Sequence, residues 1–207
     1  MSGNEEDKIL LERIRAGDRA GCDDCIRRHS PGIYRLALRL TRDETEAEDV
    51  VQETFLSAFK GISQFDGRAE LRTWLYRIAY NAAMMRLRRP KREFVSLDEA
   101  SEPDDGTPVP QQLYDWTRLP EHELQKAELR AEMEKAIAEL PDKLRAVFVL
   151  RELEDLSTEE TAKALDIKIE VAKTRLHRAR LRLRERLAGY FAGEARENQE
   201  QKRGASS

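Results

Sequence analysis

The segment that most constrains the fold is Leu71–Arg89, which reads LRTWLYRIAYNAAMMRLRR. Apolar residues recur in it every three or four positions, at Leu71, Leu75, Ile78, Ala82 and Met85. This spacing places them on one face of an α-helix, and such a helix is stable in water only when other elements cover that face. We therefore expect a long amphipathic helix at the centre of a helical domain.

A second stripe runs beside the apolar face of this helix. It contains Thr73, Arg77, Asn81, Met84 and Arg88, with Trp74 at its edge. The chain has several arginines but no acidic residue between Arg72 and Arg92. Arginine attracts phosphates, and exposed aromatic rings stack on unpaired bases. The stripe therefore fits a nucleic-acid surface, although a solvated basic face with Trp74 in the core fits the same residues.

The sequence before this helix is helical in pattern as well. We expect helices over 7–16, over 19–40 with an interruption near Ser30–Gly32, and over 45–62. The apolar face of the last of these leaves Asp49, Gln52 and Glu53 on other sides. Residues 61–69 (GISQFDGRA) contain two glycines and predict a loop with an exposed Phe65. These elements would form one compact domain over 1–93.

An acidic stretch follows the first domain. Between Glu93 and Glu123 the chain has nine acidic residues and a single basic one, Arg118. The stretch also contains several prolines, and this composition resists regular structure. We expect an irregular linker over 94–120, either an ordinary flexible tether or a segment whose negative charge has a role of its own.

Helical periodicity resumes over 121–140, and Pro141 starts a further helix. Ser157 and Glu160 form a capping box, which marks the start of a short helix, and a turn follows at 166–169. The final helix runs to about Leu187 and is basic. A helix, a tight turn and a basic helix are typical of the helix-turn-helix. The fold class is therefore all-α, with a second domain over 121–190 and a polar, disordered tail over 191–207.

The final helix has two distinct sides. Its expected buried residues are Ala172, Leu176, Ala179, Leu183 and Leu187. The opposite side presents Glu170, Val171, Thr174, His177 and Arg178, flanked by Lys173 and Arg175. This side could enter the groove of DNA, but a basic amphipathic helix inside a bundle has the same pattern.

Cys22, Cys25 and His29 share roughly one face of a helix, with the spacing C-x2-C-x3-H. A soft metal could use these ligands if a fourth came from elsewhere, but free cysteine also behaves as a small hydrophobe, and we favour core packing. Two cysteines do not make a disulfide framework, so we infer a reducing cytoplasm.

Other classes of protein find little support in the sequence. No apolar run approaches the roughly 18 residues of a membrane span, and we see no signal peptide. We find no sequence motif typical of an enzyme: no carboxylate cluster for metals, no phosphate-binding glycine loop and no nucleophile–base pair. We therefore expect a cytoplasmic protein with no cofactor, no metal and no catalytic residues.

Four motifs occur in order along the chain: DVVQETFLSAF at 49–59, FDGRAELRTWLYRIAYN at 65–81, LPDKLRAVFVLRELEDLSTEETAKAL at 140–165 and KTRLHRAR at 173–180. Together they resemble the bacterial RNA polymerase sigma factors of the extracytoplasmic-function (ECF) group, over roughly residues 7–188. The resemblance implies a first domain that binds RNA polymerase core (its β and β′ subunits) and the −10 promoter element, and a second that binds the −35 element. It also implies a stress-response role and an anti-sigma factor, which could hold the protein at the inner membrane.

The resemblance also assigns residues. Asp49, Gln52 and Glu53 would lie on the helix that docks on the clamp helices of β′. The loop 65–69 would hold a base flipped out of the −10 element, and the −10 contacts would come from Phe65, Trp74, Arg77, Asn81 and Arg88. In the final helix, Lys173, Thr174 and His177 would read −35 bases, with Arg175 and Arg178 on phosphates.

The chain departs from the family pattern at two positions of the final helix. Glu170 stands where the family usually has glycine, and Ala172 where it has a β-branched residue. Glu170 suits the helix dipole but would repel a phosphate. The competing hypothesis is an ordinary helix-turn-helix regulator that binds duplex DNA as a dimer. It explains 168–186 but not the motifs at 49–59 and 65–81.

Overall fold

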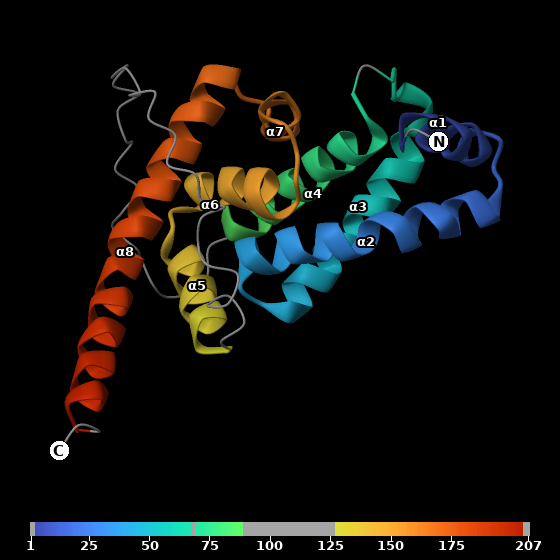
Figure 1. Cartoon of the computed structure of the whole chain (residues 1–207). Helices are drawn as coiled ribbons and strands as arrows, with labels where there is room; N and C mark the ends of the chain where they lie inside the picture. Colours follow the sequence, from blue (N-terminus) through green and yellow to red (C-terminus); the bar gives the residue numbers. More distant parts are fainter. Residues whose placement is uncertain (1–2, 68, 89–126, 205–207) are drawn as a thin grey trace.

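The computed structural model describes residues 3–67, 69–88 and 127–204 (Figure 1). All regular elements within those residues are helical, which confirms the all-α prediction. The N-terminal elements are α1 (Gly3–Arg15), α2 (Arg19–Thr41), α3 (Glu44–Gly61), the 3-10 turn η1 (Ile62–Gln64) and α4 (Leu71–Arg88). The C-terminal elements are α5 (Ala127–Glu139), α6 (Asp142–Phe148), the π-helical turn η3 (Val149–Leu153), α7 (Thr158–Leu165) and α8 (Ile169–Gly204). The acidic segment 94–120 lies outside the described residues.

Helix α4 is central, as the sequence predicts, because it packs against α2 and α3 on one side and α7 on the other. Leu71, Leu75 and Ala82 are buried as expected. The prediction that Met85 is buried is wrong, since 63% of this residue is exposed. Contact from two sides spreads burial around the helix, and its other buried apolar residues are Tyr76, Ala79 and Ala83.

Three predicted helix boundaries are wrong. Helix α2 continues through Pro31 without the expected interruption, because the buried Gly32 and Ile33 hold this turn in the core. Helix α1 begins at Gly3 rather than Asp7. Helix α8 continues to Gly204, so the prediction of a disordered tail over 191–207 is wrong for residues 191–204. The residues after Leu187 are mostly Ala, Glu, Arg and Gln, which favour helix.

Helices α7 and α8 form the predicted helix-turn-helix. The capping box is present, since Ser157 Oγ accepts from the Glu160 amide (3.1 Å) and Glu160 Oε2 accepts from the Ser157 amide (2.7 Å). Asp166 ends α7 in the left-handed region at φ 56° and turns the chain into α8. The predicted buried stripe of α8 is confirmed at Ala172, Leu176, Ala179, Leu183 and Leu187.

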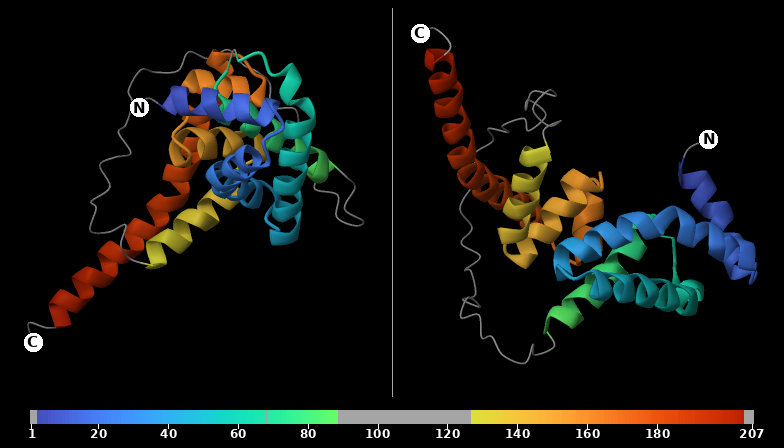
Figure 2. Two further views of the ribbon diagram at one scale, coloured as in Figure 1. Left: turned by 90° about the vertical axis from the view of Figure 1, so that its right-hand side faces the viewer. Right: turned by 90° about the horizontal axis from the view of Figure 1, so that it is seen from below.

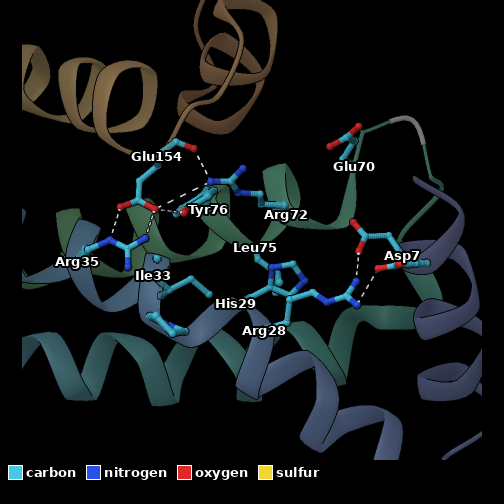
Figure 3. Close-up of a pocket in the computed structure, with 13 residues that line it drawn as sticks. Asp7, Arg28, His29, Ile33, Arg35, Glu70, Arg72, Leu75, Tyr76 and Glu154 are labelled. Carbon is cyan, nitrogen blue, oxygen red and sulfur yellow. Dashed lines mark hydrogen bonds and ion pairs between the residues drawn. The ribbon is translucent and has the colours of Figure 1, made fainter. Parts of the chain in front are cut away.

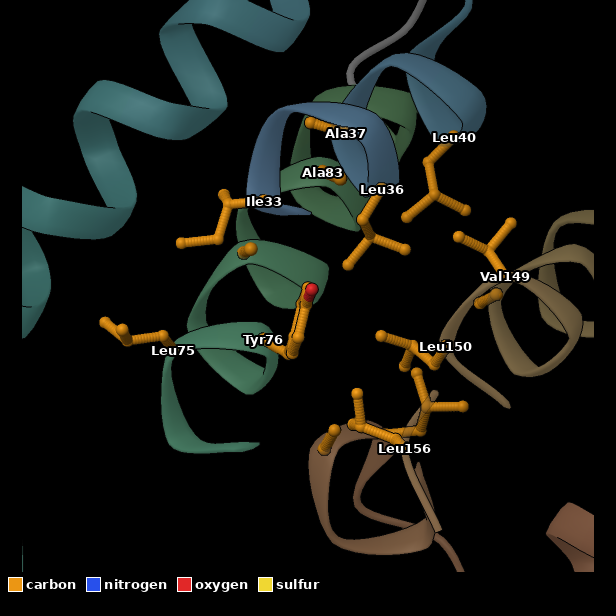
Figure 4. Close-up of a cluster of buried hydrophobic side chains, with 14 of the residues drawn as sticks. Ile33, Leu36, Ala37, Leu40, Leu75, Tyr76, Ala83, Val149, Leu150 and Leu156 are labelled. Atoms are coloured by element: carbon orange, nitrogen blue, oxygen red, sulfur yellow. The ribbon is translucent and has the colours of Figure 1, made fainter. Parts of the chain in front are cut away.

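The C-terminal helices pack against one side of the N-terminal ones, and α8 projects beyond both (Figure 2). A shared hydrophobic cluster joins the two groups. Figure 4 shows Leu36 and Leu40 pointing toward Val149 and Leu150 across the boundary, with Leu156 beside them. Among the described helices, none combines the length and the apolar character that crossing a membrane requires.

Candidate protein and nucleic-acid interfaces

The side of α3 that carries Asp49, Gln52 and Glu53 is accessible, as the sequence predicts. Gln52 is exposed, and both carboxylates are partly exposed. The apolar Leu56 extends this surface by one turn and is itself exposed. Carboxylates, an amide and one apolar side chain in this arrangement can receive a basic partner helix through charge-assisted hydrogen bonds.

Arg86 of α4 partly neutralises this surface, a contact that the sequence analysis above did not predict. Its guanidinium donates to Glu46 (2.7 Å), Asp49 (3.0 Å) and Glu53 (3.3 Å). The pKa of Arg86 is raised above its usual value, and the hydrogen bond to Glu46 makes the largest contribution to this shift. Its position could have indicated this contact. Arg86 follows Ala79 and Ala82 at helical spacing, on a face that is buried, and a charged residue there needs partners.

Phe65 is not exposed, so that prediction is wrong. Only 7% of the residue is accessible, and its ring lies against Trp74 with centroids 4.9 Å apart. Arg15 donates a hydrogen bond to the Phe65 carbonyl, which ties the loop to α1. Asp66 and Gly67 remain exposed beside it. The phenyl ring is therefore an anchor of the loop, and in this conformation it offers no free face to a base.

The second stripe of α4 is only partly open. Arg77, Asn81 and Arg88 are exposed, whereas Thr73 is buried and Trp74 is half-buried. Arg77 forms an ion pair of 3.1 Å with Asp166, the residue of the turn between α7 and α8. The outer end of the stripe is thus accessible from solvent, while its middle lies beside the helix-turn-helix.

The outer side of α8 is arranged as expected. Lys173 is exposed, and Thr174, Arg175, His177 and Arg178 are half-buried. The Thr174 hydroxyl donates to the Glu170 carbonyl (2.9 Å), so its oxygen retains accepting capacity for a base. Glu170 is exposed in the first turn of the helix, where its charge suits the helix dipole.

Cys25 lies in the core with 1% exposure, and burial raises the pKa of its thiol to about 12. Cys22 packs against the same cluster. Burial also lowers the pKa of His29, whose Nε2 atom has no hydrogen-bond partner among the described residues. No group of metal-ligating side chains large enough to hold an ion occurs in that part of the chain. These environments agree with the core-packing interpretation.

A helical N-terminal unit with an accessible acidic side and a basic helix, packed against a helix-turn-helix, is typical of DNA-binding transcription proteins. Residues 25–93 match the Sigma-70 region 2 family, and residues 130–183 match Sigma-70 region 4. The chain is 34% identical to the ECF RNA polymerase sigma factor SigW of Bacillus subtilis, over 87% of this chain and 96% of that one. It is 33% identical to the ECF RNA polymerase sigma-E factor of Escherichia coli, over 87% and 93%. The chain therefore belongs to the ECF sigma factors of RNA polymerase.

Two solved structures share this fold. The complex of CnrH with the cytosolic domain of CnrY gives a TM-score of 0.63 at 24% identity, covering 88% of this chain and 97% of CnrH. The sigma factor RpoE of Bartonella quintana, solved with the anti-sigma factor NepR, gives 0.58 at 25% identity, covering 80% and 96%. Membership makes this chain a regulator that directs RNA polymerase core to promoters through their −10 and −35 elements. It also removes the dimeric helix-turn-helix regulator as an alternative.

Proposed function

We propose that three surfaces divide the work of promoter recognition in this sigma factor. Asp49, Gln52 and Glu53 bind the β′ clamp helices of core polymerase. The outer stripe of α4, with Arg77, Asn81 and Arg88, contacts the −10 element, and the outer side of α8 reads the −35 element. The accessible carboxylate side of α3 carries this proposal best, because it sits directly against α4 through Arg86. Docking on core would therefore fix the position of the −10 helix.

The loop that precedes α4 has a supporting role in this scheme. Phe65 anchors it against Trp74, so the exposed Asp66 and Gly67 form the part that can approach an unpaired base. The acidic segment 94–120 would thread the RNA path of the polymerase. We take 1–93 and 121–190 as the limits of the two domains that would carry these surfaces.

We further infer that the protein acts in the cytoplasm on nucleoid DNA, without chemistry of its own, and that an anti-sigma factor restrains it. The structure of the Bartonella quintana sigma factor with its anti-sigma partner supports that inference. Anchoring at the inner membrane would then come from the anti-sigma factor.

Run-off transcription tests the proposed function. Core polymerase, this protein and a randomised promoter library should yield transcripts from a defined set of sequences with paired −10 and −35 motifs. In a gel shift, tight promoter binding should require core. Tight binding of the protein alone, with no transcripts in the presence of core, would contradict the proposal.

Asn81→Ala should impair opening of the −10 element. The exposed amide of Asn81 would contact an unstacked base, and removing it raises the cost of melting. We expect a larger loss of transcription from duplex templates than from templates premelted over that element. Lys60→Ala, an exposed change on α3, serves as the control. Equal losses for Asn81→Ala on both templates would mean that the residue supports folding only.

Lys173 and Arg178 should have separable effects on the −35 element. Lys173→Ala should change which bases are preferred, by about 1–3 kcal/mol for the lost contact. Arg178→Ala should weaken binding to all sequences alike and flatten its salt dependence, as expected for a phosphate contact. A promoter library scored at several salt concentrations measures both effects. The reverse pattern would show that this division of α8 is wrong.

A further inference from the structure

One apolar side chain lies on the outer stripe of α4, which otherwise carries polar and charged groups. The exposed residues of this helix are Arg77, Asn81, Met85 and Arg88. Because each residue turns the helix by about 100°, this spacing keeps all four within about 80° around the axis. Met85 therefore points in the same general direction as the three residues proposed to contact the −10 element.

The exposure of Met85 is high for a side chain of this kind. Its exposed fraction is 63%, the largest among the large apolar residues that the structure describes. Its neighbour Met84 is half-buried and packs against the hydrophobic cluster. The two methionines are thus the reverse of the expectation, in which Met84 lay on the stripe and Met85 in the core. Met85 contributes little to the core, and its apolar surface is open to a partner.

The position of Met85 along α4 indicates which part of the DNA it meets. The helix begins at Leu71, next to the loop 65–69, and Met85 lies about 21 Å further along its axis at ~1.5 Å per residue. It is about 6 Å beyond Asn81, or roughly two steps between neighbouring bases at ~3.4 Å each. Because the loop and Asn81 are proposed to hold the opened bases, Met85 would meet the edge of the element that is still paired.

The chemistry of paired DNA limits what a methionine can recognise there. In the major groove the base edges present hydrogen-bonding groups and one apolar group, the C5-methyl group of thymine. The thioether of Met85 has no donor and is only a weak acceptor, so it gains little from the other edges. Its unbranched chain adapts to the position of the methyl group. Arg88, one turn further along, suits a phosphate contact that would hold the helix in register.

We propose that Met85 is a specificity-determining residue, whose side chain packs against the C5-methyl group of a thymine at the paired edge of the −10 element. The proposal rests on the proposed function, because it requires the outer stripe of α4 to face this element. The contact adds an apolar selection for thymine to the hydrogen bonding of Asn81. Burial of one methyl group corresponds to about a fourfold preference for thymine over the same base without the methyl group.

Templates with deoxyuridine in place of single thymines test this contact, because deoxyuridine pairs as thymine does and lacks only the C5-methyl group. The promoter is one that the wild-type protein selects with core polymerase, and each thymine of its −10 element, on either strand, is replaced in turn. At one position we expect the change to weaken promoter binding by about fourfold for the wild type and for Met85→Leu. With Met85→Gln, which keeps the length of the side chain but not its apolar end, the same replacement should have no effect. The matched control is Ile9→Ala, which removes an exposed apolar side chain of α1 and should behave as the wild type.

The proposal is overturned if no thymine has an effect that depends on Met85, or if the selected −10 motif contains no thymine. A loss for Met85→Gln that is equal on thymine and deoxyuridine templates also overturns it, because that pattern fits a wedge between bases. Circular dichroism should show folded variants, as expected for changes at an exposed helical position.

Run-off transcription separates this result from the proposed function. Normal selection of a −10 motif together with a failed deoxyuridine test rejects the Met85 contact alone. The absence of transcripts from the whole library rejects the proposed function, and the Met85 contact with it.

Discussion

Neutralising Asp49 and Glu53 together is expected to weaken binding to core polymerase by about a hundredfold or more. Each carboxylate lies on the accessible side of α3, and in the proposed complex each would pair with a basic group of the partner. Asp49→Asn with Glu53→Gln preserves their shape. Charge reversal at both positions should weaken binding further, but it also sets two cations against Arg86. Titration of labelled protein with core measures the affinity.

The control for this experiment is Asp23→Asn, an exposed change on α2 away from the docking side. Thermal unfolding of the double variant should show a folded protein, because neither carboxylate belongs to the hydrophobic cluster. If the double variant binds core polymerase with the affinity of the wild type, this side of α3 does not form the core-binding surface.

Phe65→Ala should lower the free energy of unfolding by about 3–5 kcal/mol. The ring is buried, and its removal leaves a cavity beside Trp74, although the hydrogen bond from Arg15 to the main-chain carbonyl of residue 65 can still form. Urea unfolding followed by circular dichroism measures the loss. Leu56→Ala removes a side chain that is already exposed and should cost far less. If Phe65→Ala lowers the free energy of unfolding no more than Leu56→Ala does, the ring is exposed in solution and available to hold a base directly.

Local patterns were sufficient to predict most of the helical framework. The capping box at Ser157, the turn at Asp166 and the buried stripe of α8 depend on residues close in sequence, and the structure has them as expected. The spacing of Leu71 and Leu75 likewise predicts the central helix. These features follow from short-range hydrogen bonding and from helical periodicity, which a single sequence contains.

Features that depend on packing between distant segments could not be predicted in this way. The exposure of Met85 and the burial of Phe65 depend on where α7 and α1 lie. Pro31 stays helical because its neighbours are buried. Glu154 occurs within the LRELEDLS segment of the region 4 motif, and nothing nearby indicates that its hydrogen-bond partners lie 78 to 119 residues away (Figure 3). Periodicity identifies a buried face but not the element that covers it.

The bare α-carbon of Gly32 has a consequence for the genetics of this protein. Any base change that replaces this glycine introduces a side chain where the Tyr76 hydroxyl and the Glu154 carboxylate leave no space. Missense alleles at this codon would therefore loosen the packing of α2 against the C-terminal helices while leaving Asp49, Asn81 and Lys173 unchanged.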